Sequence, residues 1–115
     1  MSGTEAHPYS DAVVAGGLVF VSGSLALRPD GVVGGRAEAL AEAMETVRRR
    51  LATVNARIED VIKATYYLTD ITLRDEANAQ FCEVWTAPRP ARTVVEVADL
   101  PYGSVVEIDI VALAR

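Results

Sequence analysis

The sequence predicts a single α+β domain in which one mixed or mainly antiparallel sheet is covered on one face by two helices. Two observations carry this prediction: strand-like and helix-like apolar patterns alternate in the order ββαβαββ, and no Pro-, Gly- or Ser-rich linker interrupts the 115 residues. A chain of this length buries about two thirds of its unfolded surface, which is enough for one core without disulfides or a structural metal. We therefore expect one domain over residues 1–115.

The first two strands are predicted to form a β-hairpin. Residues 11–15 and 18–22 are apolar and rich in β-branched side chains, and Gly16-Gly17 separates them. A Gly-Gly pair accepts the positive φ angles of a tight hairpin turn. Residues 25–35 contain Pro29-Asp30-Gly31 and Gly34-Gly35 and are expected to form a loop.

Residues 36–55 are predicted to form an amphipathic helix. Apolar residues recur there at helical spacing and would form one buried stripe: Leu40, Met44, Val47, Leu51 and Val54. Three consecutive arginines, Arg48 to Arg50, lie near the end of this helix, where the helix dipole favours cations. We interpret these arginines as part of a solvated helix face.

Residues 61–68 alternate as a strand with one buried face, which we expect to carry Ile62, Ala64, Tyr66 and Leu68. A turn and a second amphipathic helix over residues 73–86 follow, with Thr72 as the predicted N-cap. Cys82 lies inside that helix near aromatic residues, and we expect it to be a small buried hydrophobic residue rather than a nucleophile.

The prolines of residues 87–91 end the second helix, because proline lacks an N–H group and restricts the residue before it. Residues 93–97 and 105–112 are then predicted to be strands joined by the turn-rich loop 99–104. Two helices cannot cover both faces of a sheet with five apolar strands. The uncovered face predicts a homo-oligomer.

Charge and composition exclude several function classes. The chain has 11 basic and 16 acidic residues, a net charge of −5 and a pI near 4.8, which disfavours binding to nucleic acid or an anionic membrane. One cysteine and one histidine cannot form a disulfide or an ordinary zinc site, and the glycines lack the spacing of a phosphate-binding loop. We therefore expect neither metal nor nucleotide cofactor.

The N-terminal residues lack a basic start followed by an apolar stretch, and no segment is long and apolar enough to span a bilayer. A cytoplasmic protein is the expectation.

Glu107 and Arg92 are the first candidates for chemistry. Glu107 lies within the apolar last strand, where it either faces an interface or solvent, the commoner case, or serves as a base that orients water. Arg92 follows Pro90-Ala91 at the start of a strand, where it either forms a weak surface ion pair or binds a carboxylate in bidentate fashion.

Other polar residues near the first hairpin are more ordinary. Tyr9-Ser10 and Ser22-Gly23 offer hydroxyl groups and flexible backbone, but such residues commonly form turns. His7 precedes Pro8 in a terminal segment that we expect to be mobile, so we set it aside as a catalytic histidine.

Several segments together resemble the Rid family of imine deaminases, also called YjgF/YER057c/UK114. The most specific part is Pro90-Ala91-Arg92-Thr93, followed by Leu100-Pro101 and Val106-Glu107-Ile108. The resemblance also covers Tyr9-Ser10-Asp11-Ala12-Val13, Leu18-Val19-Phe20-Val21-Ser22-Gly23, Tyr67-Leu68-Thr69-Asp70 and Asn78-Ala79-Gln80-Phe81. It therefore extends almost from end to end.

The resemblance implies a chorismate-mutase-like fold that assembles as a homotrimeric barrel with active sites in the clefts between subunits. It also implies hydrolysis of 2-imino acids, or of their 2-enamine tautomers, to 2-keto acids and ammonia without metal or organic cofactor. By matching position, Arg92 would bind the substrate carboxylate and Glu107 would position the attacking water. Four further residues match positions in or near the pocket: Tyr9, Ser22, Gly23 and Asn78. The backbone N–H of Gly23 would donate a hydrogen bond to the ligand.

Two departures bear on specificity: Ser24 stands where the family often has Gln, and Val94 where it often has Cys, although the Val94 carbonyl would still contact water. The alternatives are a hydrolase for one unusual imine or enamine and a non-catalytic trimer that binds small carboxylates or acts as a chaperone. The endoribonuclease activity attached to some family names fits poorly with the acidic pI.

Overall fold

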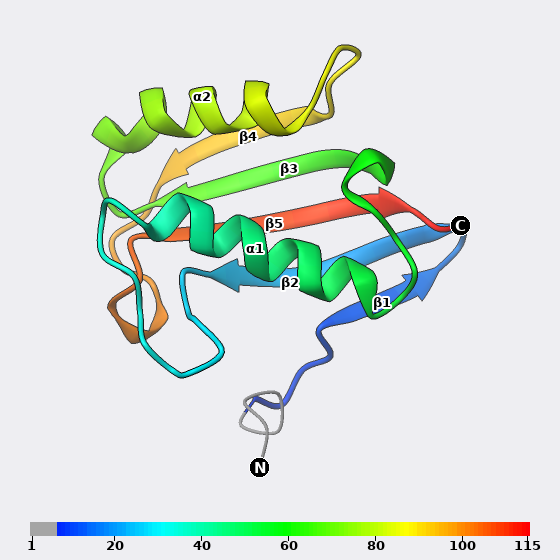
Figure 1. Ribbon diagram of the computed structural model, residues 1–115, viewed down its shortest axis with the longest axis horizontal. Helices are drawn as coiled ribbons and strands as arrows, with labels where there is room; N and C mark the ends of the chain where they lie inside the picture. Colours follow the sequence, from blue (N-terminus) through cyan, green and yellow to red (C-terminus); the bar gives the residue numbers. More distant parts are fainter. Residues whose placement is uncertain (1–6) are drawn as a thin grey trace.

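Five strands form one mixed sheet in the computed structural model, which describes residues 7–115 (Figure 1). The strands lie in the order β1-β2-β5-β3-β4; β3 and β4 are parallel, and every other neighbouring pair is antiparallel. Their bounds are Ala12–Ala15 (β1), Leu18–Leu25 (β2), Val61–Leu68 (β3), Ala91–Glu96 (β4) and Val106–Leu113 (β5). The predicted α+β class, mixed sheet and ββαβαββ order are confirmed.

Two helices, α1 (Ala39–Ala52) and α2 (Arg74–Val84), lie on the same face of this sheet (Figure 1). The core forms between this face and the helices and includes Val47 and Leu51 of α1, Tyr66 of β3 and Ile108 of β5, each no more than 1% exposed. The single 3-10 turns η2 (Ile58–Asp60), η3 (Ile71–Leu73) and η4 (Pro101–Gly103) lie in the connections. Neither helix within residues 7–115 is long and apolar enough to cross a membrane.

The predicted hairpin is present, with β1 and β2 joined at Gly16 and Gly17, whose φ angles are 60° and 79°. Both values lie in the left-handed region that glycine adopts without strain. On the sheet face away from the helices, Phe20 of β2 and Val95 of β4 are exposed. That apolar face is available to a partner.

Two predictions of buried side chains are wrong. Ile62 is 40% exposed because the register of β3 against β5 shifts between Val61 and Lys63, and this turns Val61 inward in its place. Cys82 is exposed: Phe81 is the residue of this turn that faces the core, and the next position of a helix points about 100° away.

Thr72 is not the N-cap of the second helix. The Asp70 side chain instead accepts a hydrogen bond of 2.9 Å from the Thr72 N–H and caps the turn η3, which precedes α2. An aspartate that accepts from the backbone two residues later forms the same kind of cap that was expected of the threonine.

Candidate functional site

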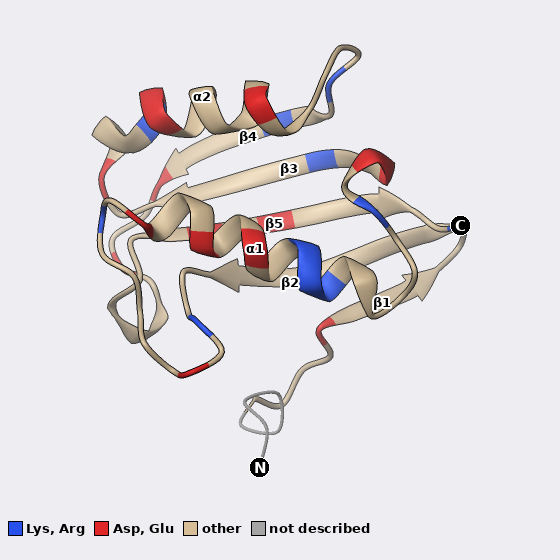
Figure 2. Cartoon of the chain, in the orientation of Figure 1, with Lys and Arg blue, Asp and Glu red and all other residues tan. Residues whose placement is uncertain are grey.

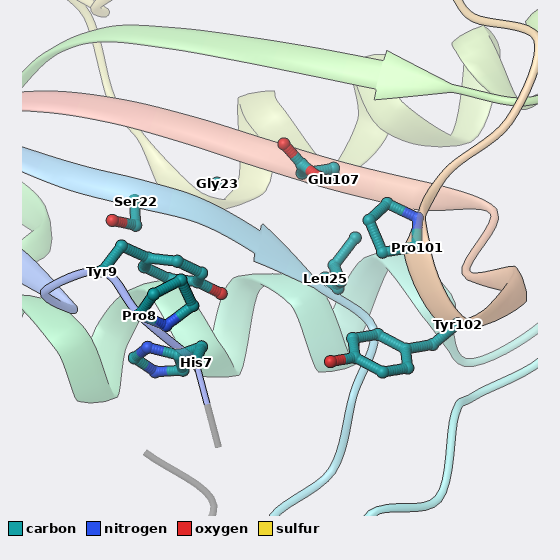
Figure 3. Close-up of a pocket in the computed structure, with 9 residues that line it drawn as sticks. All are labelled: His7, Pro8, Tyr9, Ser22, Gly23, Leu25, Pro101, Tyr102 and Glu107. Atoms are coloured by element: carbon teal, nitrogen blue, oxygen red, sulfur yellow. The ribbon is translucent and has the colours of Figure 1, made fainter. Parts of the chain in front are cut away.

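A cavity of about 390 Å³ lies beside β2 and β5, and Figure 3 shows its lining. Its walls are formed by the two strands, the turn η4 and the N-terminal segment, by which we mean residues 7–11. The lining residues are His7, Pro8, Tyr9, Ser22, Gly23, Leu25, Pro101, Tyr102 and Glu107. Four of the seven site residues predicted from the sequence therefore meet in one place: Tyr9, Ser22, Gly23 and Glu107.

A β-bulge shapes the floor of this cavity. Val21 pairs with Ile110 and Ser24 with Ile108, so β2 uses one residue more than β5 between these two pairs. The extra residue places Ser22 and Gly23 at the cavity. Such bulges re-aim side chains and interrupt regular strand pairing.

Gly23 is needed here because the side chain of Glu107 lies directly against it (Figure 3). A Cβ atom built on Gly23 would lie 2.7 Å from the carboxyl carbon of Glu107, well inside the ~3.5 Å at which carbon atoms normally touch. The glycine thus provides the space that the Glu107 carboxylate occupies.

Glu107 is a half-buried carboxylate whose environment disfavours its charge. Burial raises its pKa above the ordinary glutamate value, the neighbouring Asp109 raises it further, and the positive charge of Arg50 acts in the opposite direction. No hydrogen bond to the carboxylate contributes to this balance within residues 7–115. A group with raised pKa and free acceptor capacity in a cavity is suited to accept a proton from water.

The N-terminal segment is held against the cavity by several contacts. The Ser22 hydroxyl donates to the Ser10 carbonyl at 2.6 Å, and the Tyr9 ring stacks on His7 with 4.0 Å between ring centroids. His7 Nε2 lies 3.1 Å from the Asp11 carboxylate. From the sequence we set His7 aside as a catalytic histidine, and the structure places it in the lining of the cavity.

Arg92 lies elsewhere. In the parallel β3–β4 pair it is opposite Ala64, on the face that Tyr66 also occupies, and its guanidinium carbon lies 5.1 Å from the centroid of the Phe81 ring and 5.9 Å from that of Tyr66. Arg92 thus points toward the helices, whereas Glu107 lies on the opposite face of the sheet, two strands away. One chain does not bring the two side chains together.

Val94 and Asn78 belong to the Arg92 side of the molecule. Val94 lies two residues after Arg92 on β4 and packs against the core. Asn78 lies on α2, three residues before Phe81, and its side-chain oxygen is buried without a hydrogen-bond partner among residues 7–115. The predicted site residues therefore form two groups, one around Glu107 and one around Arg92.

Ser24, one of the two departures from the family pattern, is fully buried and donates its hydroxyl to the Ser22 carbonyl at 3.0 Å. It supports the bulge and does not line the cavity around Glu107.

A second cavity, of about 580 Å³, adjoins the first and shares five lining residues with it: His7, Tyr9, Gly23, Leu25 and Tyr102. Its far wall is formed by α1, including Thr46, Arg49, Arg50 and Thr53. Within residues 7–115, no three His, Cys, Asp or Glu side chains gather in an arrangement that would hold a metal ion.

Comparisons with known proteins agree with one another. Residues 3–114 match the family model described as Endoribonuclease L-PSP. The chain is 37% identical over 109 residues to the RutC family protein UK114 of Drosophila melanogaster, which covers 92% of this chain and 79% of the relative. It is 32% identical over 109 residues to the human 2-iminobutanoate/2-iminopropanoate deaminase, with 92% and 80% covered.

A solved structure, that of RidA from the Antarctic bacterium Psychrobacter sp. PAMC 21119, superposes with a TM-score of 0.87 at 31% identity. The match covers 93% of this chain and 89% of that one.

Proposed function

The chain belongs to the endoribonuclease L-PSP family, which includes the Rid proteins, and we propose that it hydrolyses 2-imino acids and their 2-enamine tautomers to 2-keto acids and ammonia. The human relative that shares 32% of its residues is named for this reaction. We propose further that the reaction needs no metal or organic cofactor and takes place in the cytoplasm.

The observation that carries the proposal is the state of Glu107. Its carboxylate is half-buried, has a raised pKa and lies against Gly23, in a cavity that Tyr9 and Ser22 also line. A carboxylate in this setting can hold a water molecule through one acceptor atom and take a proton from it. Hydrolysis of an imine requires a group that holds a water molecule and accepts its proton, because the water must be oriented toward an electrophilic carbon.

The chemical steps balance with Glu107 as the only proton carrier. As the oxygen of water bonds to the imine carbon, the π electrons of the C=N bond move to nitrogen and the Glu107 carboxylate takes a proton from the water. The carboxyl group then returns this proton to the amine nitrogen of the tetrahedral intermediate. Glu107 next takes the proton of the remaining hydroxyl group and passes it to the same nitrogen, so that the C–N bond breaks, ammonia leaves and the C–O bond becomes the keto group. An enamine enters the same route after it has tautomerised to the imine.

We propose that Arg92 of a neighbouring copy binds the substrate carboxylate. A guanidinium can hold a planar carboxylate through two parallel hydrogen bonds and so present the imine carbon to the water in one orientation. Because Arg92 and Glu107 lie on opposite faces of one sheet, the site needs a second chain. A homotrimer, with the exposed apolar face around Phe20 and Val95 turned inward, would bury that face and pair the two groups of site residues.

Ribonuclease activity is not favoured by the charges of the chain. Acidic residues recur over both helices and the strand ends, whereas basic residues form one larger group at the end of α1 (Figure 2). With a net charge of −5, the protein lacks the broad positive surface that phosphate backbones require.

One observation does favour a narrower variant of the proposal. The second cavity of about 580 Å³, which opens beside the first, would accommodate a substrate larger than the imine of alanine. A hydrolase for one unusual imine therefore remains the alternative, with the same roles for Glu107 and Arg92.

The test generates 2-iminopropanoate in solution from alanine with an amino-acid oxidase and follows its loss by trapping with semicarbazide. The wild type is compared with Glu107→Gln and Arg92→Ala, and with two matched controls on the exposed surface of α1, Glu45→Gln and Arg48→Ala. We expect the wild type and both controls to accelerate hydrolysis, and the two site variants to lose most of this acceleration.

Three results are informative. No acceleration by the wild type rejects general imine hydrolysis and favours a specialised substrate or a binding role. Binding of 2-ketobutyrate that is lost in Arg92→Ala, without turnover, identifies a carboxylate-binding protein. Full activity of Glu107→Gln removes Glu107 from the mechanism.

A further inference from the structure

Arg50 is the exception among the three arginines at the end of α1. Arg48 and Arg49 are exposed, as the sequence predicts, but the Arg50 side chain is only 13% exposed. Its guanidinium reaches from the helix to the edge of the sheet, toward the walls of the cavity that contains Glu107. The prediction of a solvated arginine is wrong at this position.

The contacts of Arg50 converge on the β-bulge and the N-terminal segment. Its Nη1 donates to the carbonyl oxygens of Ser22 at 3.1 Å and Gly23 at 3.2 Å, and its Nε lies 3.4 Å from the Asp11 carboxylate. The guanidinium carbon also lies 5.7 Å from the centroid of the Tyr9 ring, within the range of a cation–π interaction. One side chain therefore contacts two separate walls of the cavity.

These contacts occur where the backbone most needs them. The bulge takes Ser22 and Gly23 out of the regular β2–β5 register, so their carbonyl groups need other hydrogen-bond donors: Arg50 supplies one to each, and the Ser24 hydroxyl supplies a second to Ser22. The planar guanidinium supplies donors with fixed directions, which a flexible ammonium group cannot reproduce at two carbonyls and a carboxylate at once. Since the Glu107 carboxylate lies against Gly23, the position of this backbone also sets the position of the carboxylate.

We propose that Arg50 is the positioning residue of the Glu107 cavity: it holds the Ser22-Gly23 bulge and Tyr9 in place, and its positive charge acts on the proposed water-binding carboxylate. The proposal rests on the hydrolytic function proposed above. It assigns a role to a residue of α1 that the resemblance to the family does not single out.

Other titratable groups also surround Glu107, and the test must separate Arg50 from them. Asp109 lies on the same strand, Tyr67 is opposite on β3, and the cavity lining adds His7, Tyr9 and Tyr102. Of the charged groups that shift the pKa of Glu107, Asp109 raises it and Arg50 lowers it. Removal of the Arg50 charge should therefore raise this pKa further, while loss of the guanidinium geometry alone should not.

The experiment compares Arg50→Gln, Arg50→Lys and the control Arg48→Gln, which makes the same change at an exposed position two residues away. Imine hydrolysis is measured from pH 5 to 9 in each variant. In parallel, the pKa of Glu107 is measured directly from the carbon-13 chemical shift of its carboxyl group. Thermal unfolding shows that each variant is folded before its other properties are compared.

We expect Arg50→Gln to lower kcat/KM by about ten- to a hundredfold and to move the acid limb of its pH profile to higher pH. Arg50→Lys keeps the charge, so it should lower kcat/KM while its acid limb stays close to that of the wild type. Arg48→Gln should match the wild type in both respects.

Equal kcat/KM and equal pKa of Glu107 in Arg50→Gln and Arg48→Gln would overturn the proposal. If the wild type hydrolyses no imine, the proposed function fails, but the carbon-13 titration still decides the role of Arg50. A raised Glu107 pKa in Arg50→Gln alone would then support the proposal, and an unchanged pKa would refute it. If Arg50→Gln does not fold, Arg50→Lys provides the test through its loss of kcat/KM at an unchanged pKa.

Discussion

Replacement of Gly23 by alanine should lower the rate of imine hydrolysis and leave the stability of the fold almost unchanged. The new Cβ would lie 2.7 Å from the carboxyl carbon of Glu107, so the carboxylate must move by at least ~0.8 Å to restore an ordinary carbon–carbon contact. Misplacement of a catalytic group by roughly 1 Å costs on the order of a hundredfold in rate. We therefore expect a loss of this size in kcat for imine hydrolysis.

Stability should change little in the same variant. The φ angle of Gly23 is not among the positive values in this chain, so alanine can adopt its backbone conformation. The atoms that must move belong to the end of a flexible side chain. Alanine also reduces the entropy of the unfolded chain, which contributes about 0.4–1 kcal/mol of stability at compatible sites.

The assay pairs steady-state imine hydrolysis with thermal unfolding. Gly35→Ala is the matched control, because a Cβ atom at Gly35 would have no neighbour within 4 Å and its φ is not positive. Unchanged kcat in Gly23→Ala would refute the argument that the glycine makes room for the carboxylate. A large loss of stability would show instead that the bulge itself rejects a side chain.

Three further predictions address the charge, the core and the assembly. Asp109→Asn removes the negative charge that raises the pKa of Glu107, so the acid limb of kcat/KM should move to lower pH; a shift to higher pH would contradict this sign. Tyr66→Phe deletes the 3.0 Å hydrogen bond from the Tyr66 hydroxyl to Gln80 beneath the helices, and should lower the free energy of unfolding in urea by about 1–2 kcal/mol; an unchanged value would mean that water replaces the hydroxyl. Light scattering of the wild type should give a mass near three times the 12.3 kDa of the chain, and Val95→Asp should lower it, whereas a monomeric wild type would refute the shared site.

Several elements could be predicted because their signals are local. Gly16-Gly17 specifies a tight turn through its freedom to adopt positive φ, and the structure has both angles positive. The prolines of residues 87–91 end a helix wherever they occur, and α2 ends at Val84. Each of these outcomes depends on a few adjacent residues, so the sequence specifies it without knowledge of the rest of the chain.

The candidate site was predictable only in part. The resemblance named Glu107, Gly23, Ser22 and Tyr9, and the structure gathers them around one cavity. The same reasoning passed over His7, which lines the cavity, because one histidine among polar terminal residues does not indicate where the folded segment lies.

The sequence alone predicted the class of the fold and the order of its elements, and the family resemblance pointed to the carboxylate and the guanidinium that we assign to the chemistry. Tertiary structure decided which side chains meet, because strand register and bulges depend on pairing between distant segments. One shift in β3 turned Ile62 outward, and one extra residue in β2 brought Gly23 beneath Glu107 and under the guanidinium of Arg50. The side chains of Arg92 and Glu107 lie on opposite faces of the sheet for the same reason, since side chains alternate between the two faces along each strand and the register fixes which residues share a face.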